Sequence, residues 1–182
     1  MAADPDEIVA FWLDAGPKSW FAKSSAFDAS IRRKFEALHH AAARGEHADW
    51  AGAPKGALAL VLLFDQVPRN IFRASAHAFA TDPLARSVAR ASTAKGFDRQ
   101  VDPSLRSFFY MPFMHSEDPA DQEQGVRFFE TLEREGFGSA KWARDHRGII
   151  ERFGRFPHRN ARLGRQTTPQ EQAFLDGGGF AG

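Results

Sequence analysis

The sequence contains no cysteine among its 182 residues, which excludes disulfide bonds, thiolate metal sites and a cysteine nucleophile. It has one tyrosine against 18 phenylalanines, so most of its aromatic rings carry no polar group and are expected to fill a core. The formal net charge is only +1, and no overall field therefore favours a nucleic acid or an anionic membrane as a partner.

Long hydrophobic runs are also missing. The longest apolar run covers eight residues, 57–64, whereas a membrane-spanning helix needs roughly 20. The N-terminus, MAADPDEIVAFW, is acidic where a signal peptide has basic residues. We therefore expect a cytoplasmic protein that makes no membrane contact. At 43% hydrophobic and 26% charged residues, the composition is that of an ordinary soluble globular protein.

Helix starts are easy to recognise, because a capping residue precedes proline at five places. These pairs are Asp4-Pro5, Asp82-Pro83, Asp102-Pro103, Asp118-Pro119 and Thr168-Pro169. The first residue of each pair can accept a hydrogen bond from a free backbone N–H of the helix. Proline fits the first helical position because an N–H there would have no partner within the helix. Glu7 and Glu171 each follow their cap by three residues, as in a capping box. Sustained β alternation is scarce, so the sequence predicts an all-α fold.

The stretch GALALVLLFDQVPRNIFR, residues 56–73, is expected to form the central helix of this fold. Its first half is apolar on every side, which is typical of a buried helix. Pro68 should kink or end the helix, because its ring clashes with the preceding turn. Polar side chains surround Pro68 and must find partners, since unpaired buried polar groups are costly. They are Asp65, Gln66, Arg69, Asn70 and Arg73.

A second segment repeats this polar pattern near the C-terminus. Residues 153–160, FGRFPHRN, resemble residues 64–70, FDQVPRN, with His158 as one extra residue. The second segment contributes Arg155, His158, Arg159 and Asn160, and Arg165 follows. Two copies are a weak repeat signal, and the echo fits a recurring turn equally well.

We expect a single domain over residues 1–182, because no linker divides the chain. The last residues, 176–182, are rich in glycine and are expected to form a flexible tail. His39 and His40 are expected on the surface of a helix. The tryptophans are expected to anchor the core; they are Trp12, Trp20, Trp50 and Trp142.

Several motifs together resemble a bacterial family known only as domain-of-unknown-function family 924. They are FW and WF near the N-terminus, LLFDQVPRNIFR (62–73), AFATDPLAR (78–86), FFYMPFMHSED (108–118) and IIERFGRFPHRNARLGR (149–165). The match runs from Phe11 to the terminal glycines. The resemblance implies a tetratricopeptide-like fold of the α-α superhelix class, a compact array of antiparallel helix pairs. It implies no established activity, and the standard 34-residue repeat pattern is not visible.

Two interpretations of the arginine-rich segments stay open. The first is a pocket for a small anionic ligand or an acidic peptide end, because guanidinium groups suit carboxylates and phosphates. Its ligand-binding residues would be Asp65, Gln66, Arg69, Asn70, Arg73, Arg155, His158, Arg159 and Asn160. The second is a buried structural network in which Asp65, Glu117 and Glu151 pair with the arginines.

The segment His115-Ser116-Glu117-Asp118 adds titratable groups, which His146 and His158 could complement. A hydrolase- or lyase-type enzyme could use His115, Glu117 and His158 as catalytic residues, with arginines stabilising negative charge. The spacing matches no metal-ligand signature, so neither a metal nor a cofactor is expected. The leading hypothesis is a binding protein, with an enzyme and a helical interaction scaffold as alternatives. The oligomeric state is not predicted.

Overall fold

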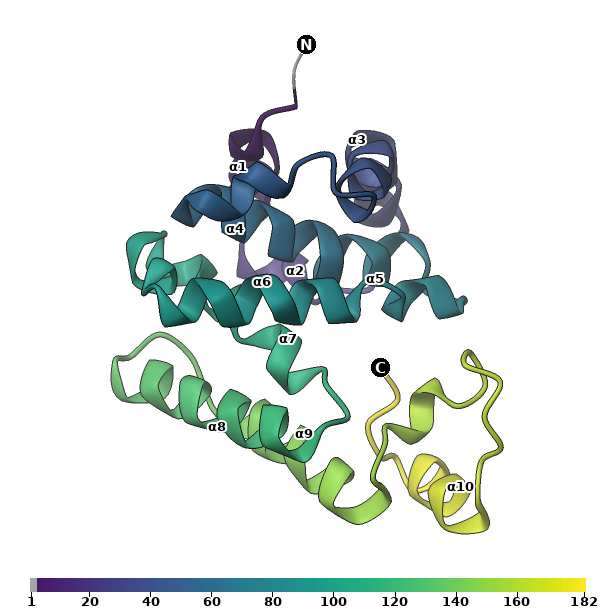
Figure 1. The fold of residues 1–182 in the computed structure, drawn as a ribbon. Helices are drawn as coiled ribbons and strands as arrows, with labels where there is room; N and C mark the ends of the chain where they lie inside the picture. Colours follow the sequence, from purple (N-terminus) through teal and green to yellow (C-terminus); the bar gives the residue numbers. More distant parts are fainter. Residues whose placement is uncertain (1–2) are drawn as a thin grey trace. The chain divides into compact units, whose positions relative to one another are not determined.

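The computed structural model describes residues 3–182, and these residues form helices and turns without any strand (Figure 1). This confirms the all-α prediction; the tetratricopeptide-like arrangement stays a prediction. The chain divides into two compact units. The first comprises the residues up to Arg73 together with His77–Pro112, and the second comprises Ala74–Ala76 and Phe113–Gly182.

The first unit surrounds helix α4 (Pro54–Val61), which packs against α1 and α6. The side chains from Ala57 to Leu63, in α4 and the beginning of the turn that follows it, are almost fully buried, as the apolar sequence predicts. The α-helices of this unit are α1 (Pro5–Ala15), α2 (Pro17–Trp20), α3 (Ser25–Ala43), α4, α5 (Val67–Ile71) and α6 (Asp82–Ala94). The short turns are η1 (Ala48–Gly52), η2 (Leu62–Gln66), η3 (Ala76–Phe79), η4 (Phe97–Gln100) and η5 (Pro103–Phe109), and α7 (Met111–Met114) leads into the second unit.

The second unit contains the helices α8 (Pro119–Arg134), α9 (Lys141–Phe153) and α10 (Pro169–Asp176), with the short turn η6 (Pro157–Arg159) between the last two (Figure 1). Helices α8 and α9 pack against each other. Gly154 ends α9 with a left-handed backbone, at φ +67°, a conformation that favours glycine. None of the helices in the described part of the chain is long and apolar enough to cross a membrane.

The central helix does not end at Pro68, one of the two outcomes that the sequence predicts, because α5 (Val67–Ile71) continues through this residue. The five residues of η2 form a π-helical turn, in which the Val67 N–H donates to the Leu62 carbonyl oxygen. This wider turn comes directly before Pro68 and accommodates the residue that cannot donate to the helix. The helix then resumes as α5 and carries Arg69 and Asn70.

Four of the five predicted caps accept backbone hydrogen bonds, and they are Asp4, Asp102, Asp118 and Thr168. Thr168 also forms the predicted capping box with Glu171. At Asp4 the side chain accepts from Asp6 N–H rather than from Glu7, so the box predicted there is wrong. Asp82 is the exception among the caps, because α6 begins at Asp82 itself and its carboxylate binds Arg69.

Two residues, His39 and Trp142, lie in environments that differ from the sequence prediction. His39 is only 4% exposed, and its Nδ1 lies 2.8 Å from the Leu63 carbonyl oxygen, so it is not a surface residue. Trp142 is 58% exposed and anchors no core. Apolar spacing places a residue on a helical face, but it does not reveal how much of that face a neighbour covers.

Gly56 lies in the first turn of α4, where the backbone passes close to Trp50. A Cβ at Gly56 would lie 2.3 Å from the Trp50 carbonyl oxygen, and backbone cannot move aside as a flexible side chain can. Gly56→Ala should therefore push η1 away from α4 and lower the free energy of unfolding by about 2 kcal/mol. Gly52→Ala is the matched control, because a Cβ there meets nothing within 4 Å. Thermal denaturation would contradict the expectation if both variants melted at the same temperature.

Candidate functional site

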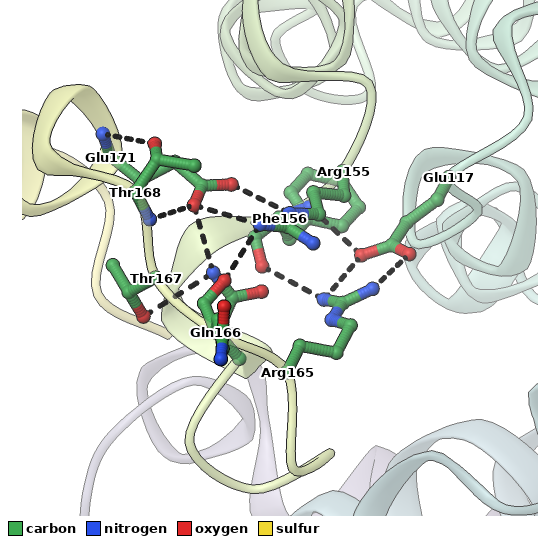
Figure 2. A network of polar contacts seen from close by, with 9 residues as sticks. Glu117, Arg155, Phe156, Arg165, Gln166, Thr167, Thr168 and Glu171 are labelled. Carbon is green, nitrogen blue, oxygen red and sulfur yellow. Dashed lines mark hydrogen bonds and ion pairs between the residues drawn. The ribbon is translucent and has the colours of Figure 1, made fainter.

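Two carboxylates organise the segment between α9 and α10 in the second unit (Figure 2). Glu117 accepts hydrogen bonds from both terminal nitrogens of Arg165, at 2.7 and 3.0 Å, and from the Phe156 N–H at 2.8 Å. Burial alone would raise the pKa of Glu117, but the hydrogen bonds from Arg165 and Phe156 outweigh it and leave that pKa below its usual value. Glu117 is therefore an ionised acceptor that fixes the chain on both sides of η6.

Glu171 is the second of these carboxylates, and it is 2% exposed. It accepts hydrogen bonds from Arg155 at 2.6 and 2.9 Å and from the Thr168 N–H at 2.7 Å (Figure 2). It also accepts one from Asn160 Nδ2 at 3.2 Å. The hydrogen bond from Arg155 is the main reason why the pKa of Glu171 falls to about 2. Arg155 and Asn160, two predicted ligand residues, therefore already share one internal partner.

A cluster of rings and one guanidinium lies beside this network, and we call it the histidine–arginine cluster. It consists of His115, His146, Phe156, His158, Arg159 and Phe180. Arg159 is 6% exposed, donates to the His115 carbonyl oxygen at 2.9 Å and lies 4.6 Å from the centre of the Phe156 ring. The ring of Phe180 lies 4.5 Å from that of His146 and 5.0 Å from that of His158.

Two histidines of this cluster, His146 and His158, are held neutral at pH 7. Burial is the main reason why the pKa of His158 falls to about 3, and the positive charge of Arg159 contributes to this decrease. Burial also lowers the pKa of His146 to about 4. His146 Nδ1 lies 2.8 Å from the Trp142 carbonyl oxygen, which can only accept, so Nδ1 carries the hydrogen and Nε2 is left as an acceptor.

Some buried polar atoms of this region have no hydrogen-bond partner within residues 3–182, and two of them belong to side chains that could contact a ligand. They are His158 Nδ1 and Asn160 Oδ1. Native proteins satisfy nearly all buried polar atoms, so such atoms commonly mark a place where a water molecule or a ligand binds. Both atoms belong to residues that the sequence suggested as ligand contacts.

The first polar segment belongs to the first unit, where Arg69 binds two carboxylates. Its terminal nitrogens lie 2.8 and 3.0 Å from the two oxygens of Asp82, and Nη1 lies 3.1 Å from Asp65. Gln66 Nε2 donates to Asp65 at 2.6 Å. The side chain of Asp65 is 1% exposed, so this group of charges is buried.

Arg73, in the same unit, binds both carboxylate oxygens of Asp28, at 2.6 and 2.8 Å. Asn70 is 9% exposed. The internal partners of the arginines are therefore partly those expected, Asp65 and Glu117, and partly others that the sequence did not suggest. Glu151 was expected among them, but it pairs with Arg147 at 3.1 Å.

No group of three or more metal-ligating side chains comes together within residues 3–182. The second unit thus combines a network of paired carboxylates and arginines with a neighbouring cluster in which one guanidinium lies beside the neutral imidazoles of His146 and His158. The network has the properties of a scaffold, and the unpartnered atoms of His158 and Asn160 remain able to form hydrogen bonds.

The chain resembles proteins whose function is not known. A family model described as bacterial protein of unknown function (DUF924) matches residues 8–179. A solved structure of a protein of unknown function from Agrobacterium tumefaciens is similar, with a TM-score of 0.90 and 46% identity over 95% of this chain and 97% of that one. No curated protein matches. The chain therefore belongs to the DUF924 family of bacterial proteins of unknown function.

Proposed function

We propose that this protein binds a small anionic ligand through the histidine–arginine cluster of the second unit. The supporting observation is a buried guanidinium, Arg159, beside two imidazoles that stay neutral at pH 7. A positive charge acts more strongly in such a water-poor site than at the surface. The planar guanidinium favours carboxylates and phosphates, including the carboxylate end of a peptide.

His158 and Asn160 would give this site its selectivity. Their unpartnered atoms, Nδ1 and Oδ1, offer hydrogen bonds at fixed positions next to Arg159. A ligand that forms hydrogen bonds with both atoms should bind more tightly than one that leaves them buried and unpaired, because an unpaired buried polar group costs about 1–3 kcal/mol. Discrimination among anions would therefore depend on shape and hydrogen bonding as well as on charge.

The remaining residues that the sequence suggests as ligand contacts do not contact the ligand in this proposal. Arg155 and Arg165 hold the η6 segment through Glu171 and Glu117. Arg69 and Arg73 are paired with carboxylates of the first unit, and we do not assign them, Asp65, Gln66 or Asn70 to ligand contacts.

The enzyme alternative would need an effective proton donor and acceptor. The lowered pKa of His146 and of His158 makes both imidazoles weak bases at neutral pH. The lowered pKa of Glu117 makes that carboxyl a poor proton donor. Binding is therefore the function that these groups support better.

A thermal-shift screen of the purified protein against inorganic phosphate, malonate, citrate and short peptides with a free carboxylate end tests the proposal. An anion present at a hundredfold excess over its Kd should stabilise the protein by about 2.7 kcal/mol. For a chain of this size, this corresponds to roughly 5–10 °C in melting temperature.

The matched variants are Arg159→Gln and His158→Gln, with His40→Gln, an exposed histidine of the first unit, as the control. We expect both cluster variants to lose the shift and the control to keep it. His158→Gln is included because the buried Arg159 also supports the fold. A shift that survives in both cluster variants, or no shift with any of these anions, would refute the proposal.

A further inference from the structure

A groove of about 710 Å³ runs along α9 in the second unit and is bordered by α10 and the C-terminal tail. Aromatic rings dominate its walls; they are Trp142, Phe153, Phe174 and Phe180. His146 lies at the end where the groove meets the histidine–arginine cluster. The volume of the groove is within the range of about 300–1,000 Å³ that is typical of small-molecule sites.

The rings of this groove are held in place by their contacts with one another and with the tail. Phe153 and Phe174 lie 5.2 Å apart between ring centres. A Cβ at Gly179 would lie 2.5 Å from the Phe174 ring, so the tail can follow the face of that ring only because residue 179 is glycine. On the α9 side, Gly148 leaves open space, since a Cβ there meets nothing within 4 Å.

The groove also carries one positive charge that no carboxylate neutralises. Arg144 pairs with Glu130 and Glu133, and Asp145 pairs with Lys141. Arg152, in contrast, makes no ion pair with any residue in the described range 3–182. Its guanidinium carbon lies 4.6 Å from the centre of the Phe153 ring and 5.7 Å from that of Phe174. The rings therefore orient a guanidinium that remains available to an anion.

We infer that this groove is a second binding site and that its ligand is an aromatic carboxylate. The aromatic body would pack among the ring walls, where ring pairs favour offset and edge-to-face contacts. The carboxylate would bind Arg152 at the edge of the groove. This inference goes beyond the proposed function, because the site uses a different arginine and requires an apolar body as well as a charge.

Isothermal titration with 2-naphthoate and its neutral counterpart 2-naphthamide tests this site. We expect the acid to bind the unaltered protein about tenfold more tightly than the amide. Arg152→Gln should weaken the binding of 2-naphthoate about fivefold and leave 2-naphthamide unchanged. Arg147→Gln is the matched control, because Arg147 lies on the same helix outside the groove and pairs with Glu151. Phe174→Leu should weaken the binding of both compounds.

Three results would overturn the inference. The first is equal affinity for the acid and the amide, and the second is unchanged 2-naphthoate binding in Arg152→Gln. The third is that the unaltered protein does not bind 2-naphthoate and instead associates with a second copy, whereas the Trp142→Ala variant does not associate. Arg159→Gln separates this site from the proposed anion site, because it should abolish the phosphate or malonate shift and retain the binding of 2-naphthoate.

Discussion

Arg69→Met is expected to lower the free energy of unfolding by about 4 kcal/mol, the largest effect of any substitution considered. The guanidinium of Arg69 bridges Asp65 and Asp82, and all three side chains are largely buried. Without this guanidinium both buried carboxylates lose their positive partner. They must then either stay ionised without it or take up a proton, and each option costs free energy of folding. For a protein of this size, we expect the melting temperature to fall by roughly 8–16 °C.

A double-mutant cycle with Asp82→Asn distinguishes pairing from packing. Replacing both charged partners by neutral residues is often far less costly than removing one of them. The combined variant Arg69→Met with Asp82→Asn should therefore be more stable than the sum of the two single changes predicts. Strict additivity in urea denaturation would show that the ion pair between Arg69 and Asp82 contributes nothing.

Glu171→Gln is expected to lower the free energy of unfolding by about 3 kcal/mol. The substitution removes the charge that Arg155, Asn160 and the Thr168 N–H share, although it keeps the size of the side chain. Glu123→Gln is the control, because Glu123 is exposed and only pairs with Arg127 within α8, so it should cost less than about 0.5 kcal/mol. Similar losses in the two variants would contradict this role of Glu171.

The contribution of Glu171 to the free energy of unfolding should also depend on pH and should decrease in acid. Its pKa is about 2 in the folded protein and lies near the ordinary value of about 4.3 in the unfolded chain. The unfolded chain therefore binds more protons between these values, and the stabilisation, complete above about pH 4.3, is lost as the pH falls towards 2. The difference in stability between the unaltered protein and Glu171→Gln should narrow over this window.

Local sequence signals predict much of the fold. Asp4, Asp102, Asp118 and Thr168 cap the helices that they were expected to cap. Capping depends on residues two or three positions away, and burial of the central helix depends on composition alone, so both can be recognised along the chain. The π-helical turn before Pro68 could not be predicted, because its wider hydrogen bonds do not follow from one residue type.

The partners of the arginines lie far away in the sequence and were therefore missed. Arg73 pairs with a residue 45 positions earlier, Asp28, and Arg155 with one 16 positions later, Glu171. The sequence predicts Glu171 at the start of a helix, in a capping box. Glu171 fulfils that role and the ion pair together. Arg152 and Phe180 gave no signal at all, because their importance arises only from the ring contacts that the fold creates.

The histidine ring signals in two-dimensional NMR, followed at pH 7 during titration with inorganic phosphate and then malonate, test the proposed anion site most directly. We expect His146 and His158 to be neutral before the titration, as their pKa values of about 4 and 3 require. One of these anions should shift both signals in a saturable manner, and His40 should not respond. The proposal would be contradicted if neither these two anions nor the others of the thermal-shift screen moved the signals of His146 and His158, or if the signal of His40 moved to the same extent.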